Sequence, residues 1–383
     1  MKREKINLDI EILRGVAIIM VMVQHLPSLF FWSSHETFTR ITNYLTFWSG
    51  VDLFFCISGY VVGKTLINRM DERNKYNISA ASVIKEFFIK RAFRLLPVSL
   101  FWVAIVLILS RYYNISGAFG IFNENIKQAL SILTYNYNWY IKTVNESGNP
   151  PTFAPYWSLN LEEQFYFVFP FFLLLVNKKY RIFTLLAIIA FLFFIKRQGF
   201  LSFNFRIDAI CYGVILAIVS DRESYRKPAD WIRRVCKNPV IALSLTIALL
   251  ILIPRSMWEF DCMVGILAIV SMFAVYLASF NEGFVSVSAL MKNIFIYIGS
   301  RSYGFYLIHM PAIYFVQEST IRYYISIGRP PSQSLALSIC MLIACLIFMA
   351  LAVEASYRFI EVPIRNYGRK IASGFKASIA RQA

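Results

Sequence analysis

Long apolar runs separated by short polar and basic segments make up most of this chain. Several runs reach the roughly 20 residues that a helix needs to cross about 30 Å of hydrocarbon. The pattern therefore predicts an all-α polytopic membrane protein with about ten transmembrane helices. The predicted spans are 10–32, 41–67, 92–110, 162–176, 182–195, 204–220, 239–254, 260–280, 294–316 and 334–356. The stretch 126–141 is too polar to cross freely.

The predicted spans run from end to end, which indicates one integral-membrane domain over residues 1–370 and a basic cytoplasmic tail over residues 371–383. The first apolar run follows a basic flank, as a signal peptide does. It is too long for a signal peptide and lacks a small-residue cleavage site, so we expect it to be retained as the first span.

The composition supports a membrane protein, because 58% of the residues are hydrophobic and only 16% are charged. Soluble chains carry roughly a quarter charged residues. The six cysteines lie mostly inside apolar runs and lack the spacing of metal ligands or of a disulfide framework. We therefore expect no metal site and small, buried cysteines.

The net charge of +17 raises the question of nucleic-acid binding, which the placement of the basic residues answers. Most Lys and Arg fall in one alternating set of inter-span segments, as the positive-inside rule describes. These segments are 1–9, 68–91, 177–181, 221–238, 281–293 and 357–383. The charge therefore predicts topology and contact with membrane lipid, with both termini cytoplasmic in a bacterial inner (cytoplasmic) membrane, and it excludes nucleic acid.

Ionisable groups inside a span are costly to insert and are candidates for function. Arg14 and His25 are eleven residues apart in the first span, so they share a helix face about 16 Å apart in depth. A histidine suits the removal of a proton from a hydroxyl group. The alternative is a buried histidine that a neighbour satisfies.

Asp52 lies within the second span and needs a partner, either a base such as His25 or a cation. Its role is structural or catalytic. Arg91 and Arg94 enter the third span at a depth similar to that of Arg14 and share one face. These cations suit the phosphates of a nucleotide-containing donor, or they extend to lipid headgroups.

Glu162 and Glu163 open the fourth span, where capping by Ser158 or Asn160 explains one acid better than two. His309 lies in the ninth span, one turn after Tyr306. Either it serves the same cavity as His25, or it bonds Tyr306 and holds helices together. The segment 111–161 is rich in Tyr, Asn and Trp, which suits carbohydrate or an interfacial aromatic belt.

Six phrases, in order, resemble the acyltransferase 3 superfamily of membrane O-acyltransferases from Leu8 to about Arg365. They are Arg14 with His25, GVDLFFCISGY at 50–60, Arg91 with Arg94, WSLNLEEQFY at 157–166, SYGFYLIH at 302–309 and FIEVPIR with Glu361. One departure is Glu11-Ile12-Leu13-Arg14, where the family often has Asp-Gly-Leu-Arg. Some members carry a further hydrolase-like domain; here the core is expected to act alone or with a partner.

The resemblance implies transfer of an acyl group, acetyl from acetyl-CoA, to a hydroxyl of a cell-surface polysaccharide or glycolipid. It implies catalysis by His25 and functional roles for Arg14, Arg91 and Arg94. We expect Asp52, Glu162, Glu163 and His309 to complete the catalytic set, and 111–161 and 317–333 to select the acceptor. A transporter or flippase of an anionic glycolipid, or an acyltransferase acting on a small molecule, would use the same residues.

Overall fold

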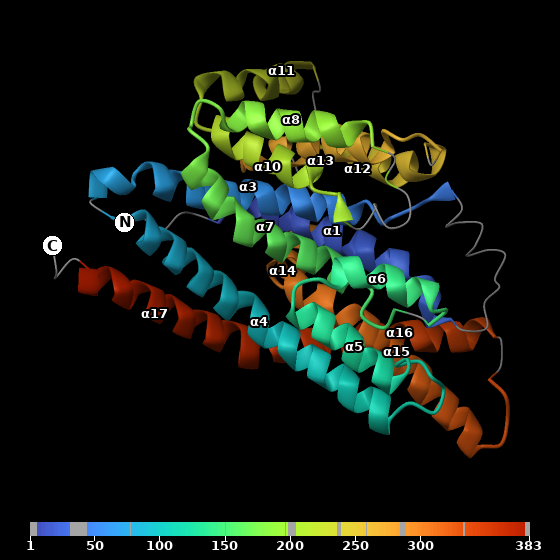
Figure 1. Cartoon of the computed structure of the whole chain (residues 1–383). Coiled ribbons are helices and arrows are strands. Elements are labelled where there is room, and N and C mark those ends of the chain that lie inside the picture. Colours follow the sequence, from blue (N-terminus) through green and yellow to red (C-terminus); the bar gives the residue numbers. More distant parts are fainter. Residues whose placement is uncertain are drawn as a thin grey trace. The chain divides into compact units, whose positions relative to one another are not determined.

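A computed structural model describes residues 6–30, 44–76, 78–149, 151–195, 197, 204–235, 239–257, 259–283, 289–331 and 334–379. Within these ranges the regular structure is helical and contains no strand (Figure 1). The all-α class that the apolar periodicity predicts is confirmed.

The chain divides into two compact units, and the helices α1, α3, α7 and α15 each contribute residues to both. Unit 1 comprises residues 1–24, 36–67 and 175–302, and unit 2 comprises 25–35, 68–174 and 303–383. The helices mainly of unit 1 are α1 (Leu8–His25), α3 (Gly50–Asp71), α8 (Arg181–Phe193), α10 (Asp208–Val219), α11 (Lys227–Val235), α12 (Pro239–Ser256), α13 (Met263–Ser279) and α14 (Ala289–Ser300). Those mainly of unit 2 are α4 (Ala80–Tyr112), α5 (Phe122–Leu133), α6 (Tyr137–Glu146), α7 (Tyr156–Leu175), α15 (Ser302–Ser326), α16 (Leu335–Ser356) and α17 (Val362–Ile379).

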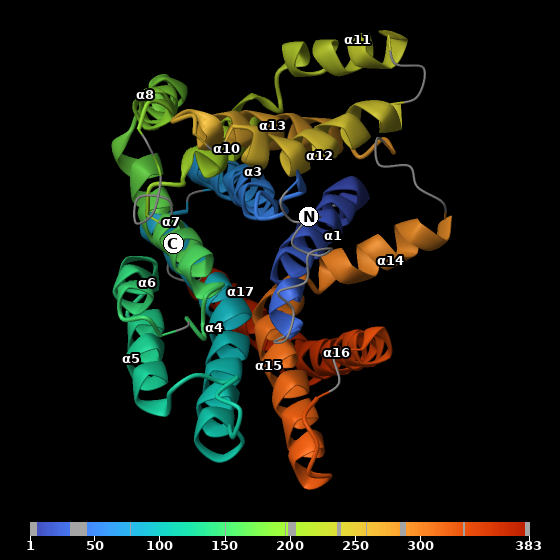
Figure 2. The same cartoon turned by 90° about the vertical axis from the view of Figure 1, so that its right-hand side faces the viewer.

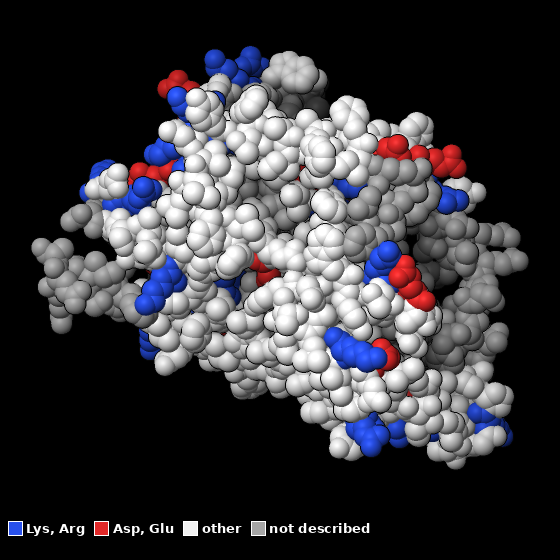
Figure 3. Space-filling view, in the orientation of Figure 1, with Lys and Arg blue, Asp and Glu red and all other residues white. Residues whose placement is uncertain are grey.

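Within the described part of the chain, four helical stretches are long and apolar enough to cross a membrane, or five if α11 and α12 form one broken span. The four are Leu8–Leu29, Gly50–Asp71, Ala80–Tyr112 and Leu335–Ser373. Shorter apolar helices α8, α10 and α13 match three further predicted spans. Large areas of the face in Figure 3 carry no charged side chain, and exposed groups such as Phe167 and Phe183 suit contact with lipid.

The predicted span 294–316 is two helices, α14 and α15, with a turn at Arg301 between them. The polar sequence Gly299-Ser300-Arg301-Ser302 weakens the helix here, because the Ser300 hydroxyl bonds the Tyr297 carbonyl. The polar stretch 126–141, which we did not expect to cross, falls on the short helices α5 and α6.

Helices α3 and α10 of unit 1 touch backbone to backbone through two glycines. A Cβ on Gly59 would lie 2.2 Å from the Ile210 carbonyl oxygen, and one on Gly213 would lie 2.1 Å from that of Cys56. Small residues at such positions allow helices to approach closely. The close approach places Asp52, on α3, beside the residues that precede α10.

Gly59→Ala is expected to destabilise the protein by about 1–3 kcal/mol, because the added methyl group meets backbone rather than a mobile side chain. The measurement is thermal unfolding of the purified protein in detergent. Gly304→Ala is the matched control, since its Cβ would meet only the Val353 side chain, at 3.3 Å. Equal unfolding temperatures for the two variants would contradict the predicted backbone contact.

In unit 2, α4 and α17 lie side by side (Figures 1 and 2). Gly368 on α17 packs against Phe93, whose Cβ would be 2.3 Å from an added Cβ. Trp102 on α4 donates its indole N–H to the Ser356 hydroxyl at 3.0 Å, at the end of α16. These contacts hold α4 against the carboxyl-terminal part of the chain.

Candidate active site

Two histidines far apart in the sequence meet in unit 2. His25 is the last residue of α1, where Pro27 ends the α-helical hydrogen bonding and a 3-10 turn, Leu26–Leu29, begins. His309 is fully buried on α15, and the two ring centroids are 5.1 Å apart. A second contact holds the same segments together, because the Gln317 amide donates to the Ser28 carbonyl.

The buried His309 ring has one nitrogen engaged and one free. Its Nδ1 lies 3.3 Å from the Phe305 carbonyl oxygen, within its own helix. Its Nε2 has no hydrogen-bond partner in the described part of the chain. A buried ring nitrogen without a partner is costly, and a bound substrate group can satisfy it.

Tyr306 connects the histidine pair to α7. Its hydroxyl lies 2.5 Å from the Ser158 hydroxyl and 3.2 Å from the Pro155 carbonyl oxygen, while its ring packs on His309 at 5.8 Å. The Tyr306 hydroxyl therefore hydrogen-bonds α7, while the Tyr306 ring packs on His309. His309 thus lies beside both His25 and Tyr306, and each of its two predicted roles stays a prediction.

The acid pair lies inside α7 rather than at its amino-terminal end. The helix begins at Tyr156, so Glu162 and Glu163 follow after more than one turn, and helix capping does not account for them. Glu162 accepts a hydrogen bond from the Tyr166 hydroxyl. Glu163 accepts one from the Asn160 amide at 3.4 Å. Ser158, Glu162 and Tyr166 follow at intervals of four residues and therefore form one polar face.

The Tyr- and Asn-rich segment packs on the start of α7. The Tyr137 backbone N–H donates to the Asn160 side-chain oxygen at 3.0 Å, and Gln164 donates to the Tyr135 carbonyl at 2.7 Å. Burial, and then the nearby charge of Glu163, raise the pKa of Tyr135. Part of the predicted acceptor-selecting segment therefore lies against the acid pair.

Arg91 of α4 lies toward the other end of the polar face of α7. The Arg91 guanidinium stacks on the Tyr166 ring at 4.7 Å and on Phe87 at 5.6 Å. Arg94 buries its Nε, which has no hydrogen-bond partner within the described ranges. From Ser158 to Tyr166 the helix rises about 12 Å, so a polar face of this length connects the histidine end of unit 2 with its arginine end.

The remaining predicted residues, Asp52 and Arg14, belong to unit 1. Both Asp52 carboxylate oxygens accept from Arg206, and both side chains are buried. Arg206 also stacks on Trp48 at 4.2 Å. Arg14 pairs with Glu11 at 2.6 Å. Glu11 is the acid of Glu11-Ile12-Leu13-Arg14, the motif that differs from the family's usual Asp-Gly-Leu-Arg.

Sequence reasoning did not identify Arg206 as the cation for Asp52. It also missed the buried pair of Arg197 and Asp208, joined at 2.7 Å. The sequence offered a signal for both residues, because Arg206 and Asp208 are ionisable and lie in or beside a predicted span, where such groups are functional candidates. Their partners depended on the three-dimensional packing of α3 and α10.

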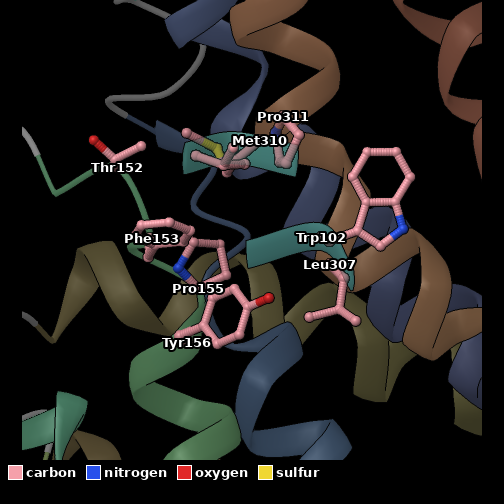
Figure 4. Close-up of a pocket in the computed structure, with 9 residues that line it drawn as sticks. Trp102, Thr152, Phe153, Pro155, Tyr156, Leu307, Met310 and Pro311 are labelled. Atoms are coloured by element: carbon pink, nitrogen blue, oxygen red, sulfur yellow. The ribbon is translucent and has the colours of Figure 1, made fainter. Parts of the chain in front are cut away.

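A small pocket in unit 2 is lined by α4, the start of α7 and the stretch 307–311 of α15, with about 280 Å³ of empty space that includes its open side. Figure 4 shows its largely apolar lining, which includes Trp102, Tyr156 and Met310. Among the described residues, no group of three or more His, Cys, Asp or Glu side chains forms a candidate metal site.

Comparisons with known proteins agree on one family. A family model described as an acyltransferase domain matches residues 7–350. The O-acetyltransferase OatA of Staphylococcus aureus, in strain COL and in strain NCTC 8325, is 27% identical over 94% of this chain and 57% of the relative. A second staphylococcal protein, provisionally named an O-acetyltransferase, is 25% identical over the same shares. The chain thus spans little more than half the length of these relatives, and no solved structure matches it.

Proposed function

Because the chain belongs to the acyltransferase domain family, we propose that it transfers an acetyl group from acetyl-CoA to a hydroxyl of an exported polysaccharide or glycolipid. The observation that carries this proposal is the His25–His309 pair at one end of the polar face of α7, with Arg91 toward the other end. Arg94 is one turn from Arg91 on α4. The relatives' names support acetyl as the transferred group.

In the proposed reaction, the His25 imidazole removes the proton of the acceptor hydroxyl as its oxygen attacks the thioester carbonyl. The new C–O bond forms and the C–S bond breaks, and the imidazolium returns the proton to the leaving CoA thiolate. His309, with its free and buried Nε2, holds the reacting oxygen or the His25 ring in place. Glu162 or Glu163 on α7 stabilises the positive charge that the His25 imidazolium carries after it takes up the proton.

The donor's phosphates bind Arg91 and Arg94 in this proposal. Guanidinium groups bind phosphate through paired hydrogen bonds. The Arg94 Nε is a buried donor that has no hydrogen-bond partner among the described residues. The asymmetry of basic residues between spans supports entry of the donor from the cytoplasmic side of a bacterial inner membrane, with ten spans and both termini on that side. For Arg14, which pairs with Glu11, a functional role stays a prediction from the sequence.

Arg91→Gln and Arg94→Gln are each expected to raise the KM for acetyl-CoA about 10- to 100-fold, the value of one charged hydrogen bond. The effect on kcat should be smaller, because these residues contact the donor away from the thioester. The measurement is radiolabelled acetyl transfer by membranes at varied acetyl-CoA. Arg111→Gln, on the same helix but exposed, is the control. If all three variants share one KM, the donor site lies elsewhere.

A further inference from the structure

Three arginines gather where α17 packs on α4. Arg94 is on α4, and Arg365 and Arg369 are one turn apart on one face of α17. The Arg369 charge is repelled by both Arg94 and Arg365. The Glu361 carboxylate, 2.8 Å from Arg365, offsets part of this charge. The cluster therefore retains an excess of positive charge.

The cluster is built into the packed interface between the two helices. Glu361 is buried at the end of a π-helical turn, Tyr357–Glu361, and such turns are frequent at functional sites. Gly368 packs against Phe93, and the Phe93 and Tyr367 rings lie 5.9 Å apart. The backbone of α17 around Gly368 is thus fixed against α4 by close packing, with Arg365 partly buried and the Arg369 side chain exposed beside it.

Buried donors in the cluster lack acceptors. The Nε atoms of Arg94 and Arg365 are buried, and neither has a hydrogen-bond partner in the part of the chain that the structure describes. A buried charged donor without an acceptor is costly, and the Arg369 guanidinium is repelled by its two neighbours. An anion with several oxygen atoms satisfies the donors and removes the repulsion.

We propose that Arg365 and Arg369, together with Arg94, bind the terminal 3′-phosphate of the CoA donor. This inference rests on the proposed function and adds two residues to its donor site. A phosphomonoester carries close to two negative charges and three oxygens that guanidinium groups bind in pairs. Arg94 is one turn from Arg91 on α4, so the cluster continues the arginines assigned to the donor.

A lipid phosphate offers related chemistry, but a phosphodiester carries one charge and fits the cluster's excess charge less well. Acetyl-3′-dephospho-CoA distinguishes the two sources, because it lacks the 3′-phosphate of CoA while the lipid phosphates are unchanged. The test compares kcat/KM for acetyl-CoA and for this analogue with the full-length protein in vesicles, with and without anionic lipid.

The wild type is expected to prefer acetyl-CoA by about tenfold or more, the value of charged hydrogen bonds to the missing phosphate. Arg369→Gln is expected to lose most of this preference. The pair Glu361→Gln/Arg365→Gln tests Arg365 without leaving a buried carboxylate unpaired. Arg358→Gln, an exposed arginine beside the cluster that pairs with Glu354, should keep the full preference.

Two results would overturn the inference alone while acetyl transfer persists. One is equal use of both donors by the wild type. The other is an unchanged preference in Arg369→Gln and in the double variant, with activity that instead follows the anionic lipid content. Absence of acetyl transfer by the wild type from either donor would overturn the proposed function, and this inference with it.

Discussion

His25→Ala is expected to lower kcat for acetyl transfer by about 100- to 10,000-fold, the range that general-base catalysis contributes. The reason is chemical, because alanine cannot accept the proton of the attacking hydroxyl. His25 is at the end of α1 and only partly buried, so the change should leave the helix intact. Radiolabelled acetyl transfer at saturating acetyl-CoA is the measurement, with the amount of folded protein checked by size-exclusion chromatography.

His309→Gln is the companion variant, because glutamine keeps a hydrogen-bonding side chain of similar length. If His309 positions the reacting groups, this variant should retain more activity than His25→Ala. Activity of His25→Ala within about tenfold of the wild type would exclude His25 as the base. In that case His309, 5.1 Å away, would be the next candidate.

Asp52→Ala is expected to destabilise the protein by about 3–5 kcal/mol, because it leaves the buried Arg206 charge unpaired. Arg206 is 4% exposed and Asp52 is fully buried. The change should lower the unfolding temperature of the purified protein in detergent by several degrees or prevent its accumulation in the membrane.

The double variant Asp52→Leu/Arg206→Met separates a structural role for Asp52 from a catalytic one. An apolar pair of similar volume can replace a buried ion pair at little cost, so we expect stability near that of the wild type. Recovery of both stability and acetyl transfer would show that Asp52 acts through the helix packing. Recovered stability without activity would instead support the catalytic role that the sequence suggested.

The sequence was sufficient to predict most of the helices, because an apolar run of about 20 residues has few other stable solutions in a membrane protein. Its errors lie at polar helix ends. The start of α7 at Tyr156 was missed because Trp157-Ser158-Leu159-Asn160 is too polar to be recognised as part of a span. The turn at Arg301 was missed for the opposite reason, since apolar runs lie on both sides of it.

The sequence pointed to candidate site residues but not to the contacts among them. Residue chemistry alone pointed to His25, His309 and the acid pair, since each is an ionisable group at a costly position. Which groups meet is a property of the fold. The contact of His25 with His309, the bond from Tyr306 to Ser158 and the pairing of Asp52 with Arg206 each join distant parts of the sequence. Sequence spacing carries no record of these contacts.

The most direct test of the central claim is transfer from radiolabelled acetyl-CoA by the purified protein in vesicles, with native glycan extract as acceptor and His25→Ala beside the wild type. We expect the wild type to release free CoA and to move label to the glycan, with the amount of CoA released equal to the amount of acetyl transferred. The variant should do neither above background. Intact acetyl-CoA with both proteins, under conditions where each is folded, would contradict the account and favour a transporter of an anionic glycolipid.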